Sequence, residues 1–313
     1  MTTANVKLSA DQANDLFYGL MDKGETKEAA DLLNDFTRVN IRESSFMEKV
    51  LPSQKIGPES LTPQLGTDKP VVLVNLEPGS PGAVTVPLGA QPVQFYIRGN
   101  RYAVYFDRIV TPKFTKDMTE LMTYGIDIRQ IVLDNSILDI EFEYDSKLLA
   151  CVDTIVGTVG STVTETGIVQ NKSINSSGAG ITRSTLAELK KILPSSAAKL
   201  QTATIVTSVI TVEDVSKFDR LAAGGDLSTE FFTEGMTKTR LLGCNWIITN
   251  KTELVNSSVF YLFASPEFMG KAFVLEDVTT FVKKEAWRLE FFSYVLKGAT
   301  IGNVASVAKA VIA

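Results

Sequence analysis

The stretch FVKKEAWRLEFFSY, residues 281–294, has the composition of a long β-strand with two mixed faces. Successive side chains of a strand point to opposite faces. Each parity here holds both apolar and charged residues: Phe281, Lys283, Glu285, Trp287, Leu289 and Phe291 on one, and Val282, Lys284, Ala286, Arg288, Glu290 and Phe292 on the other. A strand that buries one face in its own core alternates instead. Because fourteen extended residues reach about 46 Å, we predict a strand that continues beyond the core of its own domain.

The composition of the whole chain is that of an ordinary folded protein. Its 313 residues are 44% hydrophobic and 21% charged, which excludes a disordered or low-complexity chain. The formal net charge is −5, and no run of Lys and Arg is longer than two residues. Tight binding to a phosphate backbone needs clustered cations. The charge pattern therefore argues against a sequence-specific nucleic-acid binder.

The absence of histidine removes several kinds of chemistry. With a histidine count of zero, Ser-His-Asp and Cys-His nucleophile systems are impossible within the chain, as are histidine metal sites. Cys151 and Cys244 lie far apart and form no metal-type spacing, which is typical of two buried thiols in a reducing compartment. We predict no enzyme, no cofactor and no metal site. No secretory signal pattern and no membrane-spanning run is present.

The N-terminal third divides into a helical part and an irregular part. Residues 9–40 show an amphipathic pattern that begins with a capping box at Ser9 and Gln12. Residues 52–92 then hold eight of the eleven prolines, with glycines between them. Proline removes ladder donors and glycine allows turn angles, so we predict an extended arm followed by a protruding loop. A β-hairpin through Gly99-Asn100 is expected to follow the loop.

A long helical zone is predicted from Pro112 to about residue 158. Apolar residues at helical spacing mark its second half: Leu138, Phe142, Leu149, Val152 and Val156. Acidic residues lie between them: Asp134, Asp139, Glu141, Glu143 and Asp145. A pair of these carboxylates could serve as an active site. A solvated helix face is the interpretation that we favour.

The remaining segments alternate between helix and strand signals. Residues 157–183 are expected to be loop or short strands, followed by a helix at 184–194 and a buried strand at 203–212. A short helix is expected at 213–221. The Gly-rich turn at 222–226 lacks the context of a phosphate-binding loop. Strands are predicted at 239–249, as a pair around Gly243, and at 259–264.

Two long stretches carry a resemblance to a known family. They are LLGCNWIIT (241–249) followed by VFYLFASPEFMGKAFVLEDVTTFVKKEAWRLEFFSYVLKGATIGNVASVAKA (259–310), and YAVYFDRIVTPKFTKDMTELMTYGIDIRQIVLDNSILDIEFEYD (102–145). Their order resembles the major capsid proteins of tailed bacteriophages, which have the Hong-Kong-97-type fold. No single short motif is diagnostic, but the resemblance covers the chain from about residue 40 to its end.

The resemblance implies an α+β fold with named parts. Residues 1–66 would be the N-terminal arm, and residues 67–112 an extended loop that lies over a neighbouring subunit. A peripheral domain with a long spine helix and a long β-sheet would take residues 113–175 and 273–300. An axial α/β domain would take residues 176–272 and 301–313.

The same resemblance implies that the function is structural. We expect a subunit that assembles into hexamers and pentamers of an icosahedral head around viral double-stranded DNA. The charges of the quoted strand would lie where subunits meet, and its aromatic residues where the spine helix crosses. The expected interface residues are Arg98, Arg101, Lys283, Lys284, Glu285, Arg288 and Glu290.

The expected partners are copies of the chain, a portal, and decoration or scaffolding proteins, with no membrane. Packaged DNA would be contacted non-specifically, since a mildly negative wall would leave it free to exit. The subunit would belong to the virion and assemble in the host cytoplasm. Because the fold-like part starts near residue 40 or earlier, we also expect an uncleaved subunit.

Three other functions stay open at this stage. One is an encapsulin-like nanocompartment shell, which has the same fold and encloses cargo enzymes. Another is a phage tail or baseplate component. The third is a carboxylate enzyme such as a glycosidase, which no spacing in the sequence supports.

Overall fold

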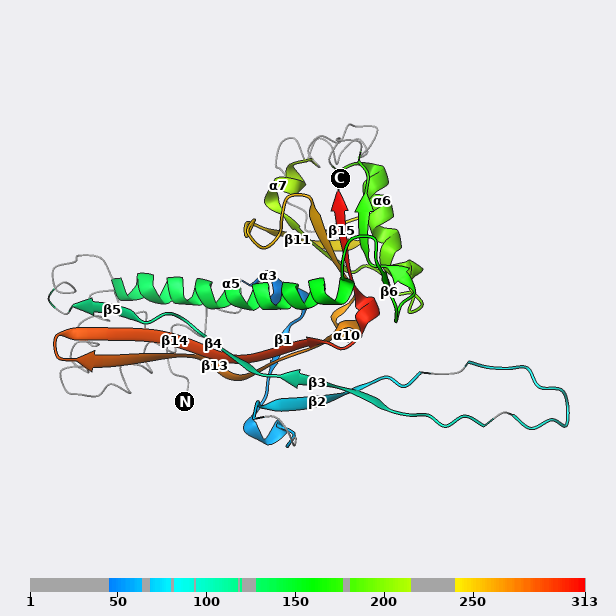
Figure 1. Ribbon diagram of the computed structural model, residues 1–313, viewed down its shortest axis with the longest axis horizontal. Coiled ribbons are helices and arrows are strands. Elements are labelled where there is room, and N and C mark those ends of the chain that lie inside the picture. The colour runs from blue at the N-terminus through cyan, green and yellow to red at the C-terminus, as the bar shows by residue number, and fades with distance from the viewer. Residues whose placement is uncertain are drawn as a thin grey trace, which may run out of the picture.

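The computed structural model describes residues 45–63, 68–79, 82–92, 94–117, 119, 128–176, 181–214 and 240–312. The helix predicted at 9–40, most of the helix predicted at 213–221 and the turn at 222–226 lie outside these residues. The main parts of the described chain are a five-stranded sheet, a six-stranded sheet, one long helix and one long loop (Figure 1). None of its helices has the length and apolar character needed to cross a bilayer.

A five-stranded sheet carries the stretch quoted above. The order is β1-β13-β14-β4, and β5 also pairs with β14. The strand bounds are β1 Ser53–Lys55, β4 Asp107–Val110, β5 Phe114–Asp117, β13 Gly270–Glu285 and β14 Arg288–Ile301. β1 is parallel to β13, and the other neighbours are antiparallel. Figure 1 shows β13 and β14 running side by side along the sheet.

The prediction of one continuous strand over 281–294 is wrong, because the chain turns in the middle of it. Glu285 pairs with Arg288, so Ala286 and Trp287 form a two-residue turn between two long strands. Cross-strand partners share a face. The even-numbered residues before the turn therefore lie on the same face as the odd-numbered residues after it. Val282, Leu289 and Phe291 are buried on one face, and Phe281 and Phe292 stack on the other. The mixed pattern is therefore two ordinary alternating strands read as one.

The long helix α5, Ile128–Val156, lies along this sheet (Figure 1). Leu149, Val152 and Val156 are buried in one core with Val295 of β14, as the helical spacing predicts. Leu138 is 52% exposed, so the prediction that it belongs to the apolar face of the helix is wrong. The core positions that take its place include Ile137, Ile140, Tyr144 and Leu148. The predicted helical zone also begins too early, because Phe114–Asp117 form β5.

A six-stranded sheet forms the second body of the molecule. Its order is β10-β11-β9-β12-β15-β8. The bounds are β8 Asn171–Ile174, β9 Thr204–Ser208, β10 Arg240–Leu241, β11 Cys244–Thr249, β12 Val259–Phe263 and β15 Val307–Ile312. The strand pair around Gly243 and the strand at 259–264 are confirmed. The segment 203–212 is only half strand, since helix α7, Val209–Val212, begins after Ser208.

The core of the second body lies between this sheet and helix α6, Arg183–Ile192. Leu186 and Leu189 of the helix are buried with Ile205, Trp246 and Phe260 of the sheet. The remaining elements are short: α3 Phe46–Val50, η1 Pro58–Ser60, β6 Thr162–Val163, β7 Ile168–Val169, η2 Leu193–Ser195, α10 Pro266–Met269 and η4 Val304–Ser306.

A two-stranded ribbon carries the long loop away from the body. β2, Val71–Leu76, pairs with β3, Asn100–Tyr105, over six residue pairs from Val71↔Tyr105 to Leu76↔Asn100. The hairpin predicted through Gly99-Asn100 is therefore wrong, because its partner strand lies before the loop. The described residues between Leu76 and Asn100 form the loop itself, which Figure 1 shows as a long excursion to one side. A protruding loop in the proline-rich segment is confirmed.

Candidate self-assembly surfaces

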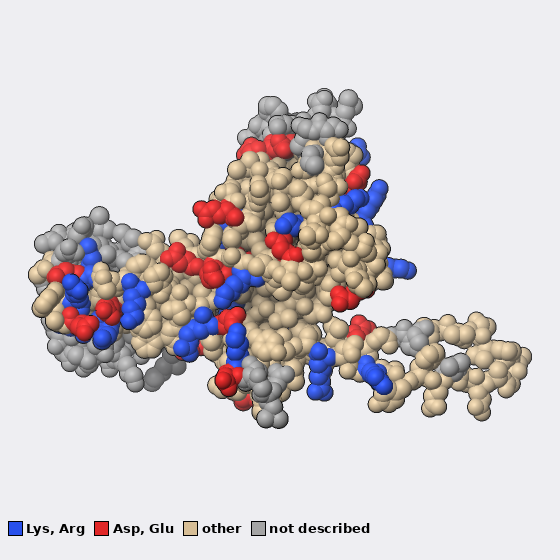
Figure 2. Space-filling model, viewed as in Figure 1, with Lys and Arg blue, Asp and Glu red and all other residues tan. Residues whose placement is uncertain are grey.

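The turn of the β13–β14 hairpin gathers five of the residues predicted for subunit contacts. Lys283, Lys284, Glu285 and Arg288 are exposed, and Glu290 is half-buried. Figure 2 shows their end of the molecule as a mixture of blue and red at the left. We name this cluster, residues 283–290, the hairpin tip. The side chain of Trp287 at the turn is 64% exposed.

Two ion pairs at the hairpin tip are long. Lys283 Nζ lies 3.7 Å from Glu285 Oε2, and Lys113 Nζ lies 3.9 Å from Glu290 Oε2. Exposed ion pairs contribute about 0–1 kcal/mol each, so these contacts hardly hold the tip in place. The position of the aromatic residues beside α5 stays a prediction. Phe291 is buried, whereas Phe281 and Trp287 are exposed.

Asp117 of β5 joins the hairpin tip from the neighbouring strand, where it pairs with Arg288. Its carboxylate accepts hydrogen bonds from the hydroxyl and the backbone N–H of Thr119, the latter at 2.9 Å. These bonds, with a smaller effect of the nearby Arg288, hold the pKa of Asp117 below its usual range. The tip therefore keeps both signs of charge at neutral pH.

The two other predicted residues lie at the opposite end of the molecule. Arg98 is in the loop and Arg101 is in β3, and both are exposed. In Figure 1 the hairpin turn and the loop point in opposite directions. The structure therefore divides the seven residues into two groups that cannot touch each other within one copy.

The loop also exposes apolar side chains that the sequence analysis did not single out. Val84, Val86 and Leu88 are exposed at every second position, and Phe95, Tyr96 and Ile97 are exposed in a row. The spacing of the first three is visible in the sequence and could have been recognised. Such a concentration of exposed apolar side chains marks an interaction surface.

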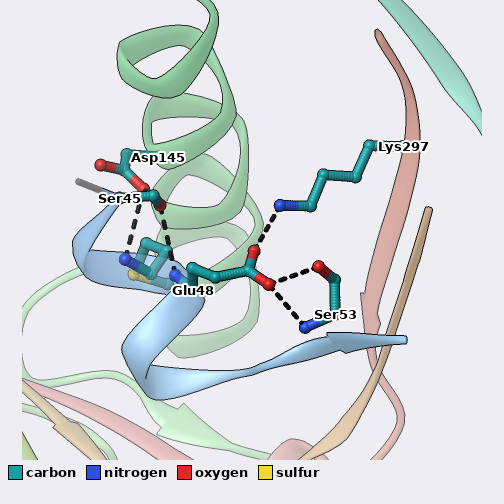
Figure 3. A network of polar contacts seen from close by, with 6 residues as sticks. Ser45, Glu48, Ser53, Asp145 and Lys297 are labelled. Carbon is teal, nitrogen blue, oxygen red and sulfur yellow. Dashed lines mark hydrogen bonds and ion pairs between the residues drawn. The ribbon is translucent and has the colours of Figure 1, made fainter. Parts of the chain in front are cut away.

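A third set of residues ties the chain before the loop to the body (Figure 3). Ser45 caps helix α3, because its Oγ accepts a hydrogen bond from the N–H of Glu48 at 3.2 Å. The same Oγ donates to Asp145 of α5 at 2.5 Å. Glu48 accepts a hydrogen bond from the N–H of Ser53 at 2.8 Å and forms an ion pair with Lys297 of β14. We name these five residues the strap network.

Asp145 corrects the prediction of a solvated acidic face. Its side chain is 0% exposed and that of Glu141 is 3% exposed, whereas Asp139 and Glu143 are exposed as predicted. The side chain of Asp134 lies outside the described residues. Asp145 is compensated by Lys251, whose Nζ lies 2.7 Å from Oδ2. Removing one partner of a buried ion pair typically costs 3–5 kcal/mol.

The electrostatics of the strap network favour a charged Glu48. Burial raises the pKa of Glu48, but the charge and hydrogen bond of Lys297 and the bonds from Ser53 outweigh it and hold that pKa below its usual range. Lys297 lies 3.7 Å from the ring centroid of Tyr144. Burial, with the nearby charges of Glu48 and Asp145, raises the pKa of Tyr144 strongly. Tyr144 therefore stays protonated.

Part of the strap network lines a pocket of 390 Å³, and Lys55 and Asp277 line the same pocket. Among the described residues no group of three or more Cys, Asp or Glu could hold a metal ion. The two central carboxylates, Glu48 and Asp145, are each bound by a lysine and a serine. This arrangement can hold α3 and β1 against α5 and β14.

Comparisons with solved structures identify the fold. The capsid of the cyanophage P-SCSP1u matches with a TM-score of 0.62 and 10% identity over 86% of this chain and 88% of that chain. The mature capsid of bacteriophage PhiM1 matches with a TM-score of 0.58 and 8% identity over 86% and 87%. A virus-like particle from Pyrococcus furiosus matches with a TM-score of 0.53 and 12% identity over 90% and 99%.

At the level of sequence, neither a protein-family model nor a curated protein matches the chain. The structural matches nevertheless span most of this chain and of each chain compared. The predicted α+β fold of the Hong-Kong-97 type is therefore confirmed. The three matched structures are two capsids and a virus-like particle.

Proposed function

We propose that this protein is the major subunit of an icosahedral phage head that encloses double-stranded DNA. The observation that carries the proposal is the shared fold with capsids over almost the whole chain. A head subunit must contact copies of itself on several sides. The loop at one end and the hairpin tip at the other supply such surfaces.

In this proposal the parts of the chain take the roles that the resemblance implies. Residues 1–66 act as the N-terminal arm and residues 67–112 as the loop that lies over a neighbour, and their strands β1 and β4 join the five-stranded sheet. The rest of the five-stranded sheet acts with α5 as the peripheral domain, and the six-stranded sheet with α6 as the axial domain. The hairpin tip residues and Arg98 and Arg101 contact other copies in hexamers and pentamers.

The charge of the chain supports a loose relation to the packaged DNA. The net charge is −5, and the charges in Figure 2 are of both signs without a large basic area on that face. DNA would be contacted non-specifically, which favours release. A portal and decoration or scaffolding proteins are the further partners in this proposal, and the virion is its location.

The second candidate is a nanocompartment shell that encloses protein cargo. The match to a virus-like particle from Pyrococcus furiosus, over 90% of this chain, supports it. The long proline-rich loop favours the head. Each structure compared above is a capsid or a particle, so a tail or baseplate role has no support from the fold.

Electron microscopy of the purified chain tests the proposal, both alone and after co-expression with the products of neighbouring genes. We expect closed shells tens of nanometres across. Particles isolated with a portal at one vertex and nuclease-protected double-stranded DNA would identify a head. Particles filled with a co-purified enzyme would instead identify a compartment.

A chain that stays a compact monomer under all these conditions would overturn both candidates. The control is a variant in which Val282 and Leu289, both buried in the sheet, are replaced by Asp. This variant should fail to fold, and its failure should be distinguishable from a folded chain that does not assemble.

A further inference from the structure

Gly302 lies where three parts of the chain meet: the five-stranded sheet, the second body and the β2–β3 ribbon. It follows Ile301, the last residue of β14, and comes shortly before η4 of the second body. The N–H of Gly302 donates a hydrogen bond to the carbonyl oxygen of Met269 at 2.9 Å, and the N–H of Asn303 donates to the same oxygen at 3.1 Å. Because Met269 is 1% exposed, the backbone at Gly302 is held against a buried residue.

The ring of Tyr102 in β3 rests directly on Gly302. A Cβ atom placed on Gly302 would lie 2.5 Å from Cε1 of Tyr102 and 2.7 Å from Cζ. Non-bonded carbon atoms are most stable at about 3.5–4.0 Å, so a residue with a Cβ would push the ring away. The φ of Gly302 is not in the left-handed region. The contact with the ring, rather than the backbone conformation, therefore requires glycine here.

The base of the ribbon is fixed to the body. Val104 of β3 and Phe106 directly after it are buried in one cluster with Phe273 of β13. A Cβ on Gly298 of β14 would lie 2.5 Å from the backbone oxygen of Tyr105, so the two backbones are in close contact at this point. The base is therefore the place about which the ribbon can turn.

A pocket borders the outer end of the ribbon. Its volume is 270 Å³, and it separates Leu76, the last residue of β2, from Thr166, Ala198 and Val304 of the second body. Gly302 lines the same pocket. Figure 1 shows the ribbon leaving the molecule below the second body, with the loop continuing in the same direction. The outer end can thus move relative to the second body while the core at the base stays intact.

A small movement at Tyr102 becomes a large one in the loop. Tyr102 lies three residues from Tyr105, which is about 10 Å of strand. A Cβ on Gly302 would require the ring to retreat by about 1 Å, which tilts the ribbon by about 6°. Leu88 lies twelve residues beyond Leu76 in the sequence, or about 40 Å of extended chain. The far part of the loop would then move by about 5 Å.

We propose that the contact of Tyr102 with Gly302 sets the direction of the loop, and with it the curvature of the shell that copies of the chain form. Both are positioning residues, because they act through the loop and need not touch another copy. The loop leaves one end of the molecule, so its direction decides the angle at which it holds a neighbouring copy. This inference rests on the proposed shell function and goes further by naming the residues that set the angle.

Pulsed electron spin resonance measures the direction of the loop. Spin labels are attached to Leu88→Cys in the loop and to Glu165→Cys on the second body, and both positions are exposed. Cys151 and Cys244 are replaced by Ala in the same chain. An excess of unlabelled chain restricts the measurement to distances within one copy. We expect Gly302→Ala to lengthen the mean distance between the labels by about 3 Å.

The matched control is Gly99→Ala, because a Cβ on Gly99 would meet no atom within 4 Å. It should leave both the distance and the shells unchanged. The double variant Gly302→Ala with Tyr102→Val should return the distance toward the wild-type value, since valine suits a strand and lacks the ring. If thermal unfolding shows that Gly302→Ala does not fold, Tyr102→Trp takes its place. It presses a larger ring on the same contact and should lengthen the distance in the same way.

Electron microscopy of the same variants tests the link to curvature. We expect Gly302→Ala to shift the mean diameter of the shells by more than the spread of wild-type diameters, or to leave the shells open. The double variant with Tyr102→Val should restore the wild-type diameter. A merely structural role of Gly302 would lower the unfolding midpoint without this shift and without this rescue.

The outcomes separate this inference from the proposed function. An unchanged distance in folded Gly302→Ala and Tyr102→Trp would show that the ring turns aside while the ribbon stays, and it would overturn the inference. A longer distance with shells of normal diameter would overturn it too, and both results leave the shell function intact. If the wild-type chain forms no shell, the proposed function fails and the effect on curvature fails with it. The distance still decides whether the two residues direct the loop.

Discussion

At the scale of single residues, the turn at Ala286-Trp287 decides how the quoted stretch folds. Ala286 has a φ of +53°, a left-handed conformation that costs an L-residue about 1–2 kcal/mol. Two-residue hairpin turns usually carry Asn-Gly or Asp-Gly for this reason. The sequence therefore lacks the signal that would have revealed the turn, and the alternation on either side of it was read as one strand.

Ala286→Gly should stabilise the hairpin by about 1 kcal/mol, because glycine adopts this φ without the steric cost of a Cβ. The expected result is a higher urea midpoint with an unchanged m-value. Ala299→Gly, within β14 where Ala299 pairs with Ala272, is the matched control and should be destabilising. A lower midpoint for Ala286→Gly would contradict the prediction.

The strap network predicts a second effect at the residue scale. Lys297→Met should destabilise the chain by about 3 kcal/mol, because it leaves the largely buried Glu48 carboxylate without its cation. The double variant with Glu48→Gln should recover part of the loss, as measured by chemical unfolding. Equal losses in the single and double variants would show that the ion pair is not the cause.

The same network predicts a dependence on pH. The folded state holds the pKa of Glu48 below its ordinary value of 4.5, so the stabilisation is complete above the unfolded pKa. It is lost as the pH falls through the folded pKa. Unfolding of Glu48→Gln should show a weaker pH dependence below about pH 4.5 than the wild type. An identical slope in both chains would exclude this role.

At the scale of elements, local patterns were predictable and distant pairings were not. The strands around Gly243 and at 259–264 follow from β-branched and aromatic runs within a few residues. The pairing of Val71–Leu76 with Asn100–Tyr105 spans a loop of irregular chain. Nothing in the sequence of either segment indicates that the other is its partner. Likewise Asp145 is buried because Lys251, 106 residues later, compensates it. A helical spacing alone could not reveal that partner.

The hairpin tip gives a prediction for an element that projects from the body. Arg288→Glu or Glu290→Lys, each alone, should impair assembly while the subunit stays soluble. Substitutions of surface charges usually change stability by less than about 0.5 kcal/mol, so the unfolding midpoint should hardly move. Sedimentation and thermal unfolding of the same samples measure both effects. Normal shells from both reversals would remove the tip from the set of subunit contacts.

At the scale of the whole molecule, the fold was predictable because it depends on the order of many segments. The resemblance rested on residues 102–145 and 241–310 together, and the structure places both around the long sheet and the second body. The strap network was not predictable in this way. It combines residues of the short α3, of β1, of α5 and of β14 that the sequence pattern does not connect.

Replacement of residues 77–99 by Asp-Gly should separate folding from assembly. Leu76 and Asn100 are cross-strand partners, so a two-residue turn can close β2 and β3 directly. We expect a monomer with an unfolding midpoint close to that of the wild type and no shells. A large loss of stability would show that the loop supports its own body. Shells of normal size would show that the loop is not needed for assembly.

The opposite positions of the loop and the hairpin tip have a geometric consequence. A contact in which each copy donates at one end and receives at the other is heterologous, and it must return to the first copy to be complete. The angle between successive copies, rather than the strength of each contact, then decides whether the ring closes. A substitution that tilts the β2–β3 ribbon slightly would therefore be expected to yield spirals or open tubes instead of free monomers.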